Sequence, residues 1–350
     1  MNILVNNSTI FWLPIFILND NSYITWKFLP FAIIIALLFS FCAFLTYYFV
    51  MIMWRIRKFH LNATIVISII FSCWFEALIG YLIISFYKYG IFNVEESGQV
   101  FEGVEFNDGH FPIVYLSSES APLLFGSILV WHYFGTVGGG VITFLIERSI
   151  ATFLFVDYES VPRLWLTIFI IFCHFFSSFF ITFLFAAHLL NLKITVILNI
   201  LGVGVCVPYF LFLRYYNTRV RDQLRNGTSC NTKHTLAAKF QTEENVRSFK
   251  LASRLAYTGA TLDIFFAFVL FLIYRKIEPT VLVFNLVEMV VLLNPIIVIP
   301  IVLSSVKDWW NCFRSRLPRS KIESEDFYYS TKSKEATSDL YFLQLQNLWV

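Results

Sequence analysis

The long apolar stretches of this chain lack basic residues altogether. Seven runs are long enough to cross about 30 Å of hydrocarbon, and none of them contains Lys or Arg. Only 14% of the 350 residues are charged, whereas 58% are hydrophobic. Because soluble domains carry about one quarter charged residues, this composition argues against a soluble domain and indicates an integral membrane protein.

The chain also lacks the motifs of the common enzyme and cofactor classes. Its six Cys residues form neither a CxxC pair nor a metal-binding spacing. It contains no P-loop, no dinucleotide-binding glycine motif and no zinc-hydrolase motif, and no internal repeat at a solenoid period. We therefore expect a protein that is not an enzyme, holds no cofactor or metal, and binds no nucleic acid.

Each apolar run is predicted to be a transmembrane helix. Backbone amides in lipid find their partners within an α-helix, whereas a lone strand leaves them unpaired. The expected fold class is an all-α integral membrane protein, built as a bundle of seven transmembrane helices. The predicted spans are residues 28–54, 63–87, 122–146, 164–190, 194–213, 255–274 and 280–303.

The distribution of basic residues predicts the orientation of the bundle. Of the 26 Lys and Arg residues, 21 lie in four alternate segments between and after the spans, and five lie in the others. The four rich segments are 55–62, 147–163, 214–254 and 304–350. Basic residues accumulate on the cytoplasmic side. We thus expect an extracellular N-terminus (1–27), a bundle (28–303) and a cytoplasmic tail (304–350).

The predicted extracellular segments carry two features. Overlapping glycosylation sequons begin at Asn6 and Asn7, with chance occurrence as the alternative reading. The segment 88–121 holds six acidic residues against Lys88 alone. Such a loop forms a lid, draws cationic ligands toward the mouth of the bundle, or is simply solvated.

Acidic side chains inside the predicted spans are candidates for function. Each costs about 2.5–3.5 kcal/mol on insertion scales, so such residues usually face the interior of a bundle. They are Glu76, Asp263 and Glu288, with no basic residue inside the spans to pair with. Glu76 lies near the middle of its span and Glu288 in the outer half of the seventh. We name both as ligand-pocket candidates, and structural hydrogen bonding is the alternative.

Trp131 and His132 in the outer half of the third span are further pocket candidates. Interhelical hydrogen bonding is the alternative for His132. In the seventh span, Asn294 and Pro295 form a candidate bending point, because proline frees a carbonyl and kinks a helix. A static kink is the alternative there.

The predicted cytoplasmic side begins with the pair Glu147–Arg148 at the end of the third span. The acid can hold Arg148 in one state and release it in another, which would present a cation to a partner. Anchoring at the membrane interface is the alternative. Asp157 and Tyr158 follow in the same segment and are named as coupling candidates with this pair.

A second basic element precedes the sixth span. Arg247, Lys250 and Arg254 recur at spacings of three and four, so they share one face if the helix extends below the membrane. Such a stripe binds anionic lipid or docks a cytoplasmic partner. Cys312, just beyond the seventh span, is either a palmitoylation site or a free thiol.

Taken together, the motifs resemble a nematode chemoreceptor family, serpentine receptor class e (epsilon). The resemblance rests on Asn7-Ser8-Thr9, Trp12-Leu13-Pro14, Glu147-Arg148-Ser149-Ile150-Ala151-Thr152 and Asp157-Tyr158-Glu159. It implies a G-protein-coupled receptor in the plasma membrane of chemosensory neurons. Such a receptor binds a small-molecule stimulus from outside and signals through a heterotrimeric G protein.

Two other classes remain open at this point, a ligand-gated cation channel subunit and a small-solute transporter. Channels built from seven-helix subunits usually have the reverse orientation, and transporters favour paired repeats. The chain also departs from the rhodopsin-like pattern. It has no Cys at the start of the third span and no proline in the sixth. Whether Arg148 forms a rhodopsin-type lock with the sixth helix therefore stays open.

Overall fold

The computed structural model describes most of the helical bundle and parts of its connections. The described residues are 2–5, 9–13, 29–92, 94, 96–102, 110–154, 163–187, 189, 192–226, 242–243, 245–259, 261, 288–289 and 292–316. Asn6, Asn7, Asp157, Tyr158 and Asp263 therefore lie outside them, and the predictions made for these residues stay predictions.

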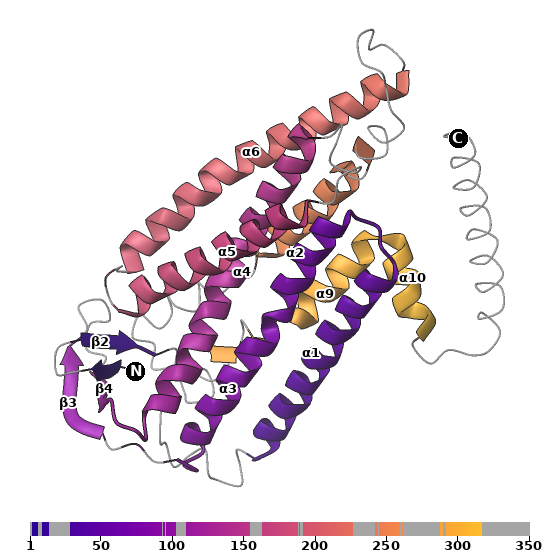
Figure 1. The fold of residues 1–350 in the computed structure, drawn as a ribbon. Coiled ribbons are helices and arrows are strands. Elements are labelled where there is room, and N and C mark those ends of the chain that lie inside the picture. Colours follow the sequence, from indigo (N-terminus) through magenta and orange to yellow (C-terminus); the bar gives the residue numbers. More distant parts are fainter. Residues whose placement is uncertain are drawn as a thin grey trace.

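Long helices dominate the described residues (Figure 1). They are α1 (Leu29–Arg55), α2 (Leu61–Ser72), α3 (Trp74–Lys88), α4 (Ala121–Phe153), α5 (Leu164–Ala186), α6 (Leu192–Asn226), α9 (Asn294–Ser305) and α10 (Lys307–Arg316). Residues 245–259 are also helical, and we refer to them as the 245–259 helix.

Four described stretches are long and apolar enough to cross a membrane. They are α1, the stretch Leu61–Lys88 that combines α2 and α3, α4 and α5. The pair α9 and α10, bent by 117°, is a fifth if it counts as one span. The predicted spans 194–213, 255–274 and 280–303 each include residues, or side chains, that the structure does not describe. The structure thus shows a mostly helical membrane protein, while the number seven stays a prediction.

The outward faces of these helices are suited to lipid. On α5, the rings of Phe172, Phe176 and Phe180 stack along one exposed face, with centroids 6.3 and 6.4 Å apart. The opposite face buries mostly small and polar residues, such as Ser178 and Thr182. Small residues at helix contacts and large apolar residues outside are the arrangement expected in a bilayer.

Close contacts between helix backbones depend on glycine. A Cβ atom built on Gly80 of α3 would lie 2.5 Å from the backbone oxygen of Gly126 on α4. A Cβ on Gly135 of α4 would lie 2.7 Å from the Thr182 side chain of α5. Because real Cβ atoms do not approach so closely, α3 and α5 pack against α4 at a spacing that larger residues would not permit.

A four-stranded sheet covers one end of the bundle, which we call the sheet end (Figure 1). Its strands are β1 (Asn2–Val5), β2 (Thr9–Trp12), β3 (Glu96–Glu102) and β4 (His110–Tyr115), in the order β2-β1-β4-β3. Strand β1 runs parallel to β4, and the other pairs are antiparallel. The prediction of an all-α chain was wrong here, because the N-terminal segment pairs with residues about a hundred positions away.

The opposite end carries α10 and is called the α10 end. Trp309 of α10 is buried against Phe49 and Phe59, and its indole Nε1 donates to the Ile56 carbonyl oxygen at 2.9 Å. Cys312 on the same helix is half-buried and forms no disulfide. Burial raises the pKa of its thiol. Palmitoylation of Cys312 stays a prediction.

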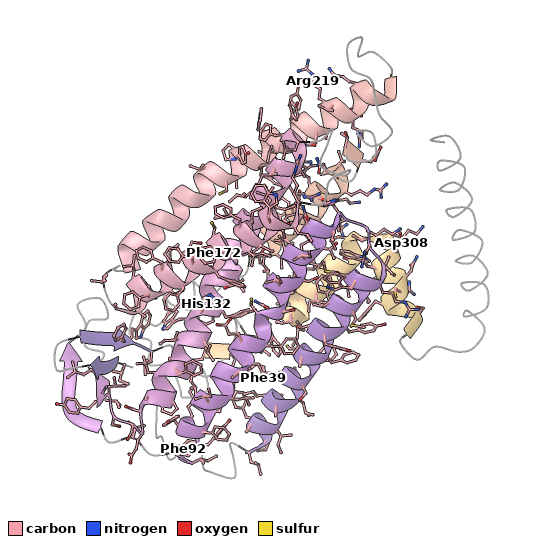
Figure 2. All side chains as sticks on the ribbon, viewed as in Figure 1. Phe39, Phe92, His132, Phe172, Arg219 and Asp308 are labelled. Atoms are coloured by element: carbon pink, nitrogen blue, oxygen red, sulfur yellow. The ribbon has the colours of Figure 1, made fainter. Side chains whose placement is uncertain are left out.

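Figure 2 shows Asp308 and Arg219 far from Phe92 of the sheet end.

Several helix ends differ from the predicted ones. Helix α4 continues to Phe153, so Glu147 and Arg148 lie within the helix and not in a following loop. Helix α6 runs to Asn226 and residues 245–250 are helical, which agrees with helices that extend beyond the membrane. Asn294 and Pro295 begin α9 after a turn at 292–293. They therefore follow a break in helical structure, and their role as a bending point stays a prediction.

The Gly80–Gly126 contact generates a stability prediction. We expect Gly80→Ala to lower the free energy of unfolding by about 1–3 kcal/mol, the usual effect of overpacking. Gly138→Ala is the matched control, since a Cβ at Gly138 meets nothing within 4 Å. Thermal unfolding of the purified receptor measures both. Equal melting temperatures for the two variants would contradict the close packing of α3 on α4.

Candidate functional site

Among the described residues of the α10 end, Arg148 carries the most deeply buried charge. Its side chain is 0% exposed, and that of Glu147 is 1% exposed. Arg148 Nε donates to Glu147 Oε2 at 2.5 Å, and Arg148 Nη2 donates to Glu147 Oε1 at 2.6 Å. Both carboxylate oxygens of Glu147 thus accept hydrogen bonds from Arg148, in the bidentate geometry that makes arginine–carboxylate pairs strong.

The remaining terminal nitrogen of Arg148 reaches a second helix. Arg148 Nη1 donates to Asn245 Oδ1 at 3.3 Å and to Ser248 Oγ at 3.2 Å, both on the 245–259 helix. The guanidinium also lies over the ring of Phe144, 5.8 Å from its centroid. Arg148 therefore connects α4 to the 245–259 helix. The partners described for it on that helix are neutral side chains.

Helix α6 joins the same cluster through amide side chains. Asn217 Nδ2 donates to Thr152 Oγ1 at 3.0 Å, and Asn245 Nδ2 donates to Asn217 Oδ1 at 3.0 Å. Thr152 is one turn below Arg148 on α4, and its hydroxyl donates to the Arg148 carbonyl oxygen at 2.8 Å. We call these six residues the arginine network: Glu147, Arg148, Thr152, Asn217, Asn245 and Ser248.

The arginine network contains residues that the sequence analysis missed. Asn217, Asn245 and Ser248 are each at most 3% exposed, and no local pattern in the sequence marks them. The three residues of the predicted basic stripe, Arg247, Lys250 and Arg254, do not share one environment. Arg247 and Lys250 are exposed, whereas Arg254 Nη1 donates to Ser304 and Ser305 of α9 at 3.3 and 3.2 Å.

Three consecutive residues of α4 bind three different elements nearer the sheet end. Trp131 Nε1 donates to the Trp12 carbonyl oxygen of β2 at 2.9 Å. His132 Nδ1 lies 2.7 Å from Glu76 Oε1 of α3. Tyr133 and Asn294 of α9 exchange hydrogen bonds of 3.1 and 2.9 Å. The predicted pocket residues Glu76, Trp131 and His132 are therefore close together, and Asn294 joins them through Tyr133.

Glu288 has a partner that the sequence analysis excluded. Its carboxylate forms an ion pair with Lys88 at the C-terminal end of α3, and the two side chains are 5% and 3% exposed. Lys88 lies one residue beyond the predicted second span, and its long side chain reaches into the bundle. The expectation that Glu288 lacks a basic partner is thus wrong. Its carboxylate is held by Lys88 in this conformation.

Nothing in the described part of the chain gathers three His, Cys, Asp or Glu side chains into a group that could hold a metal ion. In the described residues, α4 takes part in two sets of polar contacts with other elements, one around Arg148 and one at residues 131–133. Long apolar helices tied together by such buried contacts define a polytopic helical membrane protein.

Comparison with known proteins identifies the family within that class. The model of the Sre G protein-coupled chemoreceptors matches residues 1–350, and the chain belongs to this family. Serpentine receptor class epsilon-29 of Caenorhabditis elegans is 30% identical over 98% of this chain and 99% of its own length. Class epsilon-45 of that organism is 28% identical over the full length of both chains. Class epsilon-38 is 27% identical over 97% of each.

The family result confirms the resemblance to class epsilon receptors and the function predicted from it. The chain is a chemoreceptor of the G-protein-coupled type, and its relatives are receptors and not enzymes. The channel and transporter alternatives are not favoured.

The bond between Tyr133 and Asn294 generates a second prediction. Tyr133→Phe leaves the buried Asn294 amide without this partner, so we expect the free energy of unfolding to fall by about 1–3 kcal/mol. Tyr257→Phe is the control, because Tyr257 is 74% exposed. Chemical or thermal unfolding of the purified protein measures both variants. Equal stability of Tyr133→Phe and wild type would contradict a structural bond between α4 and α9.

Proposed function

We propose that the chain is a seven-helix receptor whose sheet end faces outside and binds a small-molecule stimulus. Its α10 end then faces the cytoplasm and engages a heterotrimeric G protein. In this assignment residues 1–27 are extracellular, 28–303 form the bundle and 304–350 form a cytoplasmic tail. The positive-inside distribution supports this orientation, and the family supports the plasma membrane of chemosensory neurons as the location.

The observation that carries the proposal is the complete burial of Arg148. A guanidinium that is 0% exposed is not available to a partner protein, so the described conformation corresponds to the uncoupled state. In the coupled state, α6 and the 245–259 helix separate from α4 and Arg148 becomes accessible. Exposed Arg247 and Lys250 flank the opening from the 245–259 helix and supply further cationic contacts. Asp157 and Tyr158 remain coupling candidates on sequence grounds.

Helix α4 supplies the physical connection between the two ends. His132 and Arg148 are sixteen positions apart on this helix, which is about 24 Å at 1.5 Å per residue. A stimulus that changes the contacts of Glu76, Trp131 or His132 acts on the same rigid element that holds the arginine network. Such coupling requires that the stimulus bind the two states with different affinity.

The arginine network makes a prediction that needs no identified stimulus. We expect Asn245→Ala to raise basal G-protein activation several-fold, because Arg148 loses a bond that holds the 245–259 helix in place. We expect Arg148→Ala to reduce basal activation below wild type, because the proposed cationic contact is removed. Nucleotide exchange on a reconstituted heterotrimeric G protein measures both, at equal amounts of folded receptor.

Arg57→Ala is the matched control for these variants. Arg57 is exposed at the same end of the bundle and stacks on Trp54, 5.7 Å from the ring centroid, outside the arginine network. Its basal activation should equal that of wild type. The proposal fails if Asn245→Ala and Arg148→Ala both retain wild-type activation.

A further inference from the structure

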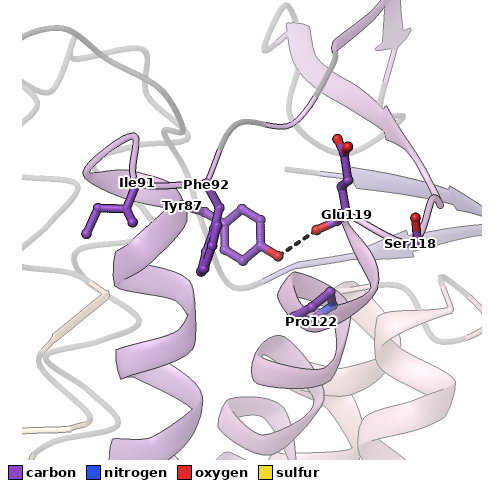
Figure 3. Close-up of a pocket in the computed structure, with 6 residues that line it drawn as sticks. All are labelled: Tyr87, Ile91, Phe92, Ser118, Glu119 and Pro122. Atoms are coloured by element: carbon purple, nitrogen blue, oxygen red, sulfur yellow. Dashed lines mark hydrogen bonds between the residues drawn. The ribbon is translucent and has the colours of Figure 1, made fainter.

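A cavity of about 510 Å³ lies at the sheet end, between the end of α3 and the start of α4 (Figure 3). Its lining residues are Tyr87, Ile91, Phe92, Ser118, Glu119 and Pro122. None of them belongs to the predicted pocket around Glu76 and His132. Small-molecule sites in proteins occupy about 300–1,000 Å³, so the size suits a compact ligand.

The walls of this cavity are held in place by the protein itself. Tyr87 is buried, and its hydroxyl donates to the Glu119 carbonyl oxygen at 2.6 Å, which joins the end of α3 to the start of α4. The Phe92 ring lies 5.5 Å from the Tyr87 ring and 5.8 Å from the Phe86 ring. Figure 3 shows the Tyr87 hydroxyl directed at Glu119 across the site. The cavity is therefore formed without a ligand.

Its apolar side is uncovered. Ile91 and Phe92 are 61% and 52% exposed, although both border a concave surface. Exposed apolar groups that converge on a hollow indicate an apolar binding partner. The exposed ring of Phe92 additionally favours a cation placed over its face.

The polar side of the cavity carries negative charge. Glu119 is the only charged residue among the described lining residues, and its side chain is exposed beside Ser118. Lys88 follows Tyr87 in sequence but is buried in its ion pair with Glu288, so it does not offset Glu119. The segment 88–121 as a whole holds six acids against this one lysine, and its field attracts cations.

We propose that this cavity binds an apolar molecule that carries a protonated amine. The apolar body packs on Ile91, Phe92 and Pro122, and the ammonium group pairs with the Glu119 carboxylate. The binding itself does not depend on the proposed signalling function. An effect of binding on signalling does rest on that function. Such an effect would act through α3 and α4, the two helices that meet at Gly80 and Gly126.

The test is equilibrium binding to the purified full-length receptor in an uncharged maltoside detergent, which supplies no amine headgroup. The probes are 2-phenylethylamine and tryptamine, with 2-phenylethanol and phenylacetate as neutral and anionic analogues. We expect saturable binding of the amines, about tenfold tighter than that of the alcohol, and no saturable binding of phenylacetate.

Two variants locate the site. Glu119→Gln removes the charge and keeps the backbone oxygen that Tyr87 uses, and Phe92→Ala removes an exposed ring. We expect each to weaken amine binding about tenfold. Phe180→Ala and Asp222→Asn are the matched controls, because Phe180 is an exposed ring on α5 and Asp222 an exposed acid on α6. Both should bind the amines as wild type does.

The inference is overturned if neither amine binds saturably, if amine and alcohol bind equally well, or if Glu119→Gln binds as tightly as wild type. These outcomes are distinguishable from failure of the proposed function. Amine binding can be lost while the Arg148 and Asn245 variants still change basal activation, and in that case only the cavity assignment fails.

Discussion

A fully buried guanidinium constrains the α10 end of this receptor more than any other described group. Leaving such a charge without its partner costs about 3–5 kcal/mol, so Arg148 requires its paired carboxylate and amide partners. Glu147 satisfies two of its nitrogens from the same helix, and the 245–259 helix satisfies the third. The position of that helix is thereby linked to the burial of one cation.

Between the arginine network and the sheet end, α4 also forms polar contacts with other elements. Glycines let α3 and α5 lie close to α4, so contacts made at one level of the bundle are transmitted through tightly packed backbones. Trp131, His132 and Tyr133 bind β2, α3 and α9 in turn. A stimulus that alters the contacts of His132 or Tyr133 therefore acts on the packing of α4 against α3 and α9.

Much of this was readable in the sequence because lipid imposes simple rules. Runs without Lys or Arg gave four spans that agree with α1, α2 with α3, α4 and α5, and the Glu147–Arg148 pair stood out against apolar neighbours. Other features depend on contacts between distant residues. No local sequence pattern predicts the parallel pairing of β1 with β4. The same holds for the ion pair of Lys88 with Glu288 and for the hydrogen bond between Asn245 and Asn217.

The central claim is that Arg148 holds the 245–259 helix against α4, and a distance between these helices tests it most directly. Spin labels at exposed Phe153 and Lys250 would report that distance by pulsed electron resonance in the full-length receptor. The account predicts one short distance in the wild-type background and a longer, broader distribution after Arg148→Ala. An unchanged distribution in that variant would contradict it.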